Sequence, residues 1–285
     1  MTQDKGTLYL VGTPIGNLED MSPRAIRVLS EVDCVAAEDT RQTRKLFSKF
    51  SISNRLISLH RHNENVKAAW LVSQLEQGQS VALVSDAGMP GIADPGEVLV
   101  RLAAQAGIVV ISVPGPSAVL AALSLSGLDT SRFVFEGFLP KSGKLRKQRL
   151  EQLKEEPRTM AFFAGPHQIL RDLADMRCAW GERQASVSRE ITKYHEETRR
   201  GDLSSLINSW SEEPPLGEMV LIVQGAPIRK EDISWEAVLD DVRQMTCNGT
   251  RLKTAASLVA EKHGLSKREV YNRSIQERER HGDPD

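Results

Sequence analysis

The 285-residue sequence has few features of secreted, membrane or metal-binding proteins. Its three cysteines, Cys34, Cys178 and Cys247, are far apart and form no CxxC pair. This number and spacing argue against a disulfide framework and against structural zinc, and they favour a reducing compartment. No apolar run approaches the roughly 20 residues of a membrane span. The first ten residues lack the cationic start and apolar core of a signal peptide, so we expect a cytoplasmic protein.

The sequence also lacks an excess of charge of either sign, since its net charge is −1 at pH 7. Proteins dedicated to nucleic acids usually present a basic face, so any such contact must come from local patches. The clearest patch is 141–149, with five basic residues in nine and no acidic one. A second consists of Arg41, Arg44, Lys45 and Lys49. A solvated helix surface is the alternative explanation for either patch.

A third absence concerns phosphate binding, because the sequence contains neither GxxxxGK[ST] nor GxGxxG. Three glycine-containing loops, 11–16, 85–96 and 114–118, also hold five prolines: Pro14, Pro90, Pro95, Pro114 and Pro116. Proline donates no N–H and fixes φ, whereas a phosphate cradle needs many free backbone N–H groups. We interpret these loops as rigid walls for a compact ligand.

Each of these loops follows a short apolar run that predicts a buried strand, at 7–11, 81–84 and 108–113. In an open parallel sheet such loops gather at the carboxyl ends of the strands, where ligands bind. The sequence therefore predicts an α/β domain over residues 1–128. Within it, Asp94 and Glu97 resemble a capping box, so we expect a helix that Asp94 caps.

The alternation continues after a pause at 128–132 and predicts a second α/β domain over residues 129–226. Its strands are expected at 133–136, 159–163, 184–187 and 218–223, and its helices at about 144–156, 166–176 and 202–210. The crevice between two such domains is the expected place for cofactor and substrate.

The character changes at 227–285, where helices are expected at 231–245 and 251–280 without strands. A glycine turn at Gly264 separates two helices, a spacing that suits a helix-turn-helix. A plain helical hairpin is the alternative.

Eight motifs occur in an order that resembles the S-adenosylmethionine enzymes with the tetrapyrrole-methylase fold. They are VGTPIGNLED at 11–20, AAEDTR at 36–41, HNE at 62–64, VSDAGMPGIADPG at 84–96, PGPSA at 114–118, EGFLP at 136–140, SREITKYHEE at 188–197 and GEMVLIVQG at 217–225. Within that superfamily the chain is similar to the bacterial enzymes that methylate a cytidine ribose 2′-oxygen in small-subunit ribosomal RNA. The resemblance implies S-adenosylmethionine as cofactor, no metal, a homodimer, and ribosomal RNA or the small subunit as partner.

The resemblance also implies where the cofactor lies, in a cleft between two α/β domains with a C-terminal helical region beyond them. The implied cofactor-binding residues come from the three loops and from the second domain: Pro14, Ser85, Asp86, Ala87, Gly88, Ser117, Ala118, Phe163 and Met219. For Asp86, the cap of a following helix is the alternative role. RNA contact is expected from Lys144, Arg146, Lys147 and Arg149.

A ribose hydroxyl is a weak acid, so a base, or a cation that stabilises the forming alkoxide, would assist methyl transfer. The main catalytic candidates are Glu38, Asp39, Arg41, Glu190 and Lys193, and further candidates are His60, His62, Asn63, Glu64 and Arg189. For Glu38 and Asp39 the alternative is the acidic first turn of a helix.

One stretch, 162–168, departs from the pattern of the family. Ala164 stands where a carboxylate is usual and Gln168 where a cation is usual. If those two groups form an internal ion pair, their joint loss is nearly neutral. If they position RNA or cofactor, the activity or the substrate differs. Two other functions therefore stay open: a tetrapyrrole methyltransferase, and a non-catalytic RNA-binding assembly factor.

Overall fold

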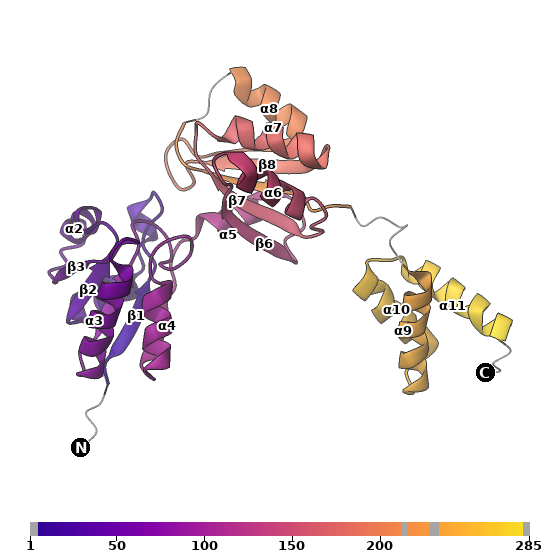
Figure 1. The fold of residues 1–285 in the computed structure, drawn as a ribbon, viewed down its shortest axis with the longest axis horizontal. Helices are drawn as coiled ribbons and strands as arrows, with labels where there is room; N and C mark the ends of the chain where they lie inside the picture. The colour runs from indigo at the N-terminus through magenta and orange to yellow at the C-terminus, as the bar shows by residue number, and fades with distance from the viewer. Residues whose placement is uncertain (1–4, 213–215, 228–233, 282–285) are drawn as a thin grey trace. The chain divides into compact units, whose positions relative to one another are not determined.

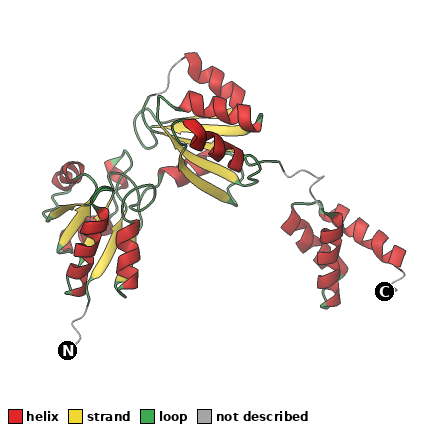
Figure 2. Ribbon diagram, viewed as in Figure 1, coloured by secondary structure: helices red, strands yellow, loops and turns green. Residues whose placement is uncertain are grey.

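The computed structural model describes residues 5–212, 216–227 and 234–281. The chain divides between Gly225 and Ala226 into two compact units. Among the described residues, the first unit contains two five-stranded sheets and the second contains only helices (Figures 1 and 2). Within the described ranges, no helix has both the length and the apolar character that a membrane crossing requires.

The first sheet is parallel throughout, with strand order β3-β2-β4-β1-β5. The strands are β1 (Thr7–Val11), β2 (Cys34–Ala37), β3 (Leu56–Ser58), β4 (Val81–Val84) and β5 (Val109–Val113). β2 and β4 are buried along their whole length, as expected for central strands covered on both faces. The parallel arrangement brings the loops after β1, β2, β4 and β5 to one edge.

Helices cover both faces of this sheet. They are α1 (Pro23–Glu31), α2 (Thr40–Lys49), α3 (Glu64–Glu76) and α4 (Glu97–Gln105), with a short 3-10 turn η1 at Leu18–Asp20. Leu71 of α3 and Leu99 of α4 belong to one core cluster, whereas Leu29 of α1 and Phe47 of α2 belong to another. The sheet therefore has a core on each side. Ser22 caps α1 as the sequence predicts, and its hydroxyl accepts from the Ala25 N–H at 3.1 Å.

The second sheet is mixed, with strand order β6-β7-β10-β8-β9. Its strands are β6 (Phe133–Phe138), β7 (Thr159–Ala164), β8 (Gln184–Arg189), β9 (Glu197–Asp202) and β10 (Met219–Val223). Only β6 and β7 pair in parallel. The polar strand β9, which the sequence did not predict, lies at the edge of the sheet beside β8.

Helices also cover both faces of the second sheet. The helices after β6 are α6 (Gly143–Leu153), α7 (Ile169–Trp180) and α8 (Leu203–Glu212). Leu173 of α7 and Leu206 of α8 share a core cluster with the strands. On the other face lies α5 (Ala118–Ser126), which packs Val119 and Leu123 against Val220. Although α5 precedes residue 128, where we predict that the first domain ends, its apolar side packs against the second sheet.

The second unit consists of α9 (Trp235–Cys247), α10 (Leu252–His263) and α11 (Lys267–His281) in its described part. These helices share a small core that includes Val238, Val259 and Val270. Gly264 ends α10 in the left-handed conformation, as the predicted glycine turn requires. The first residues of the helix predicted at 231–245 lie outside the described ranges.

Candidate active site

A cavity of about 920 Å³ lies at the carboxyl edge of the first sheet. Its wall on that side comes from Glu38 after β2, from residues 86–89 and 92–94 after β4, and from the loop after β5. Its opposite wall comes from β6, β7, β10 and from Glu190, Ile191 and Lys193 after β8. Segments from both sheets therefore enclose one site, which the sequence predicted for the crevice between its two α/β domains.

Backbone hydrogen bonds hold the proline-containing loops together. The Thr13 N–H donates to the Gly88 carbonyl at 2.9 Å, and the Gly88 N–H donates to the Thr13 carbonyl at 3.0 Å. Gly12 and Gly115 lie so close that a Cβ on Gly12 would be 2.7 Å from the Gly115 Cα. Side chains at these two positions would push the loops apart, so this edge of the sheet depends on both glycines.

The side of the cavity next to the first sheet is acidic. Glu38, Asp86 and Asp94 all line it. Burial, with the nearby charges of Asp94 and Asp86, raises the pKa of Glu38 above its ordinary value. Burial also raises the pKa of Asp94, and the charge of Asp86 adds to that shift. Glu38 and Asp94 are partly buried and Asp86 is exposed, and the three carboxyls lie among like charges, so the wall suits a ligand that carries positive charge.

The loop that follows β8 forms a tight structure at the opposite wall. Glu190 and Thr192 have φ values of 51° and 69°, a region that costs energy for residues other than glycine. The Lys193 ammonium donates to the Glu190 carboxylate at 2.9 Å, and both side chains line the cavity. A Cβ on Gly16 would lie 2.6 Å from Lys193 Cγ. The loop therefore presses against the first loop of the chain and presents an ion pair to the cavity.

Aromatic rings complete the apolar part of the wall. Phe135 and Phe138 lie against Phe163, with ring centroids 5.1 and 5.4 Å apart, and all three line the cavity together with Phe133. Residues two apart on a strand share a face, which accounts for Phe133 and Phe135. The bulge between Phe135 and Gly137 shifts the register by one residue, which brings Phe138 to the same face.

Comparison with known families identifies the chain. The family described as Tetrapyrrole (Corrin/Porphyrin) Methylases matches residues 7–207, and the RsmI C-terminal HTH domain matches residues 234–278. The chain belongs to the tetrapyrrole methylase family. Its fold class, two α/β parts with a C-terminal helical region, is therefore confirmed.

Comparison with individual relatives identifies a group within this family. The chain is 45% identical to ribosomal RNA small subunit methyltransferase I of Synechocystis sp. over 273 residues, which cover 95% of this chain and 98% of that protein. It is 46% identical to the protein of the same name from Pseudomonas aeruginosa over 277 residues, 95% and 97% of the two chains. At this identity and coverage, the chain belongs to the family of ribosomal RNA small subunit methyltransferases I.

A solved structure supports the fold alone. Uroporphyrin-III C-methyltransferase from Thermus thermophilus, complexed with S-adenosyl homocysteine, is 18% identical and has a TM-score of 0.55. The likeness covers 77% of this chain and 97% of that one.

Most of the predicted site residues of this tetrapyrrole methylase lie at the cavity. Those that line it are Glu38, Asp86, Ala87, Gly88, Ser117, Ala118, Phe163, Glu190, Lys193 and Met219. Pro14 and Ser85 do not line it. The buried Ser85 hydroxyl donates to the Ala87 carbonyl at 3.1 Å, so it supports the loop from behind. Residues that the sequence did not single out, such as Ile15, Met89 and Phe135, also line the cavity.

Asp39 and Arg41 lie outside the lining and pair with each other. The Asp39 carboxylate accepts from the Arg41 backbone N–H at 2.8 Å, as the N-cap of α2. It also accepts from the Arg41 guanidinium at 2.8 Å, and these bonds lower the pKa of Asp39 to about 2. Asp39 thus has the helix-start role that we gave as its alternative. Asp86 meets this segment, because its carboxylate accepts from the Asp39 N–H at 3.0 Å.

The segment 60–64 supports the cavity from outside its lining. The Glu64 carboxylate accepts from the N–H groups of Gly96 and Val98, at 2.7 and 3.2 Å. The prediction that Asp94 caps a helix is wrong: α4 begins at Glu97, Gly96 is its N-cap residue, and Asp94 lines the cavity. Gly96 has no side chain to cap with, so Glu64 supplies the missing acceptor from another helix.

The basic patch at 141–149 divides in two. Lys144 and Lys147 are exposed, and the half-exposed Arg149 pairs with Glu136. Arg146 is buried, with its guanidinium 2.7 Å from Asp172 and 2.6 Å from Asp175. Its predicted contact with RNA is inconsistent with this burial, because two carboxylates already neutralise the guanidinium. The corrected patch is Lys144, Lys147 and Arg149.

The departures at 162–168 fall on two different features. Ala164 is buried and lines the cavity at the end of β7. Gln168 is the N-cap residue of α7 and makes no side-chain cap bond. Neither position leaves a charge without its partner, because both charged groups of the usual pattern are absent together.

Proposed function

We propose that this protein transfers a methyl group from S-adenosylmethionine to the ribose 2′-oxygen of a cytidine in small-subunit ribosomal RNA. As a member of the ribosomal RNA small subunit methyltransferase I family it is a methyltransferase, and S-adenosylmethionine is the methyl donor of that family. The observation that carries the proposal is the cavity, which is acidic on one wall and apolar with an ion pair on the other.

The residues of the cavity fit this cofactor. Asp86, Glu38 and Asp94 offer negative charge to a ligand with a sulfonium and an ammonium group, while Phe163 and Met219 offer an apolar surface to an adenine. The cofactor supplies a methyl group on a positively charged sulfur. Two backbone hydrogen bonds join Gly88 to Thr13, and the Ser117 hydroxyl caps α5, so both loops are held in place to orient a ligand.

The acceptor side is assigned to Lys193 and Glu190. A ribose hydroxyl loses its proton as the new bond forms, and a nearby ammonium stabilises the negative charge that develops on the oxygen. The Glu190 carboxylate orients that ammonium through their 2.9 Å hydrogen bond and is itself a candidate to receive the proton. The strained backbone at Glu190 and Thr192 fixes both groups at the wall.

Contact with the RNA backbone is assigned to the corrected basic patch. Lys144 and Lys147 are exposed on α6. In the chain, α6 comes directly after β6, whose last residue, Phe138, lines the cavity. Lysine side chains of this kind bind phosphates without reading sequence.

Three further expectations belong to the same proposal. The few separate cysteines favour a cytoplasmic protein. A homodimer is implied by the resemblance to the family, and Val109, 59% exposed on the edge strand β5, is compatible with it. We also infer that residues 1–128, 129–226 and 227–285 act as three functional domains.

Mass mapping of ribose methylation tests the proposal. Small-subunit RNA from cells with and without this protein is digested, and each 2′-O-methylated nucleotide is located. We expect one cytidine to lose its methyl group in the absence of the protein and to regain it when purified protein and S-adenosylmethionine are added to isolated small subunits. Parallel reactions with naked RNA show which form is the substrate.

The other two functions give different results in these assays. A tetrapyrrole methyltransferase would methylate a precorrin and leave the RNA unchanged. A non-catalytic assembly factor would bind no S-adenosylmethionine in calorimetry. Either result would contradict the proposal.

A further inference from the structure

A second, smaller pocket of about 440 Å³ adjoins the cavity. The two share Ile15, Pro114, Gly115 and Ser117 as wall residues. A molecule in the small pocket would therefore lie directly beside a ligand in the cavity. Small-molecule sites have volumes of roughly 300–1,000 Å³, so the small pocket has room for one nucleoside.

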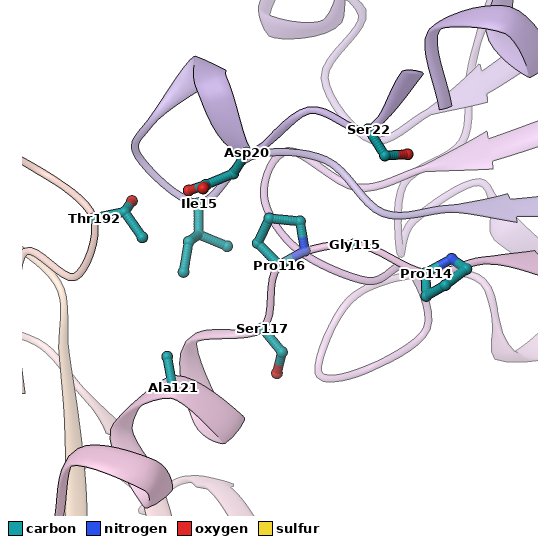
Figure 3. A pocket seen from close by; sticks show the side chains of 9 residues that line it. All are labelled: Ile15, Asp20, Ser22, Pro114, Gly115, Pro116, Ser117, Ala121 and Thr192. Atoms are coloured by element: carbon teal, nitrogen blue, oxygen red, sulfur yellow. The ribbon is translucent and has the colours of Figure 1, made fainter. Parts of the chain in front are cut away.

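The lining of the small pocket suits the base of a nucleotide better than its phosphate. Figure 3 shows the ring of Pro116 beside Ile15, with Asp20 and Thr192 approaching Ile15 from two different segments. Among the described residues that line the pocket there is no lysine or arginine. A phosphate would meet one carboxylate and no cation, whereas a flat base would meet proline and aliphatic surfaces.

Asp20 is the one charged side chain in that lining. It belongs to η1, and its carboxylate makes no hydrogen bond or ion pair within the described parts of the chain. The hydroxyls of Ser22 and Ser117 accept from helix N–H groups, at 3.1 and 3.4 Å, so each retains a proton to donate. The pocket therefore offers one strong acceptor and two hydroxyl donors.

We propose that this pocket holds the base of the acceptor nucleotide and that Asp20 selects cytosine by accepting from its exocyclic amino group. An ionised carboxylate accepts and cannot donate, and pairing with the cytosine N4 amino group is the base contact that aspartate and glutamate make. Uracil carries a carbonyl oxygen at the same position, which would face the carboxylate as a second acceptor. The inference rests on the proposed function, which places a ribose beside the cavity.

The test compares target RNAs that carry cytidine or uridine at the methylated position. Methyl transfer is measured for the wild type, Asp20→Asn and Asp20→Ala as kcat/KM on each RNA. An asparagine can donate to the uracil oxygen as well as accept from the cytosine amino group. We expect Asp20→Asn to reduce the preference for cytidine at least tenfold, by gaining activity on the uridine RNA, and Asp20→Ala to lose activity on the cytidine RNA.

Glu19→Gln is the matched control, because it removes a neighbouring exposed carboxylate of η1 that does not line the pocket. It should keep the wild-type preference. Calorimetry with S-adenosylhomocysteine should give the same affinity for Asp20→Asn as for the wild type, which shows that the cavity is intact.

Two outcomes separate the inference from the function on which it rests. If the wild type methylates the cytidine RNA and Asp20→Asn keeps its preference within twofold, Asp20 does not select the base and only this inference fails. If the wild type binds the cofactor but methylates neither RNA, the proposed function is wrong, and the inference that rests on it is wrong with it.

Discussion

The Glu64 carboxylate, at the first residue of α3, accepts a 2.7 Å hydrogen bond from the Gly96 N–H just before α4. It accepts a second from Val98 at 3.2 Å. The loop before Gly96 contains Ala93, whose φ of 63° places it in the left-handed region, and the Arg61 guanidinium donates to the Ala93 carbonyl. Ala93 and its neighbours line the cavity. Two side chains from outside the site therefore fix one of its walls.

Replacement of Glu64 by Ala should weaken both the fold and the site. The loss of a helix-capping acceptor costs about 1 kcal/mol of stability, with a range of roughly 0.5–2 kcal/mol. The loosened loop should also lower the affinity for S-adenosylmethionine. Glu64→Gln is the matched variant, because its amide oxygen still accepts from both N–H groups. Urea unfolding and calorimetry measure the two effects. Equal cofactor affinity in all three proteins would show that the hydrogen bonds from Gly96 and Val98 to Glu64 do not affect cofactor binding.

Replacement of Asp86 by Arg should abolish cofactor binding while the protein stays folded, because Asp86 lines the cavity from a loop outside the core. Asp86→Asn should bind more weakly than the wild type, since it keeps an oxygen for the Asp39 N–H and loses only the charge. Calorimetry and circular dichroism measure binding and folding. If Asp86→Arg retained its affinity for S-adenosylmethionine, the only role of Asp86 would be to accept from the Asp39 N–H.

The pH dependence of stability should reveal the partly buried Glu38. Its pKa is raised above the ordinary value of 4.5 by burial and by Asp94 and Asp86. The folded protein then holds this proton more tightly than the unfolded chain, so the contribution of Glu38 to stability falls as pH rises from 4.5 through the raised pKa. Glu38→Gln removes this loss. Its gain in Tm over the wild type should be small at acidic pH and larger at neutral pH.

Glu19→Gln, an exposed position outside the cavity, serves as the control for that series. A difference in Tm between Glu38→Gln and the wild type that does not change with pH would contradict the role of burial. At neutral pH, Glu38→Gln should also bind S-adenosylmethionine more weakly, since it reduces the negative charge of the wall.

Replacement of neighbouring cations of α6 should have opposite effects, depending on whether the cation is buried or exposed. Arg146→Ala leaves Asp172 buried without its partner, and both side chains of the pair are only 4% exposed, so we expect a loss of about 3–5 kcal/mol of stability. Joint replacement of the exposed Lys144 and Lys147 by Ala should leave stability almost unchanged and lower the slope of RNA affinity against salt concentration. Urea unfolding and filter binding at several salt concentrations separate the two effects. An unchanged salt slope would assign the lysines to plain solvated surface.

The sequence by itself determined the local structure of the site. Apolar runs of four to six residues predicted the strands at 7–11 and 81–84, and the prolines and glycines after them predicted rigid loops at one edge of a sheet. These signals are local: periodic burial and the conformational limits of proline and glycine act within a few residues. The same reasoning placed the loops that carry Asp86, Gly88 and Ser117 at one edge, where these residues line the cavity, because parallel strands place the ends of their loops together. The residues of the opposite wall, Phe163 and Met219, were implied by the resemblance to the family.

Only the tertiary structure decided which charges are free. Lys144 and Arg146 look alike in the sequence, yet one is exposed and the other is buried between two carboxylates of α7. Asp94 looks like a helix cap, yet the acceptor at the start of α4 is Glu64, 32 residues before Gly96. The polar edge strand β9 and the bulge at Gly137 were not predicted from the sequence either. Each of these outcomes depends on partners that are distant in the chain, and the energy of a charge is set by those partners and by its distance from water.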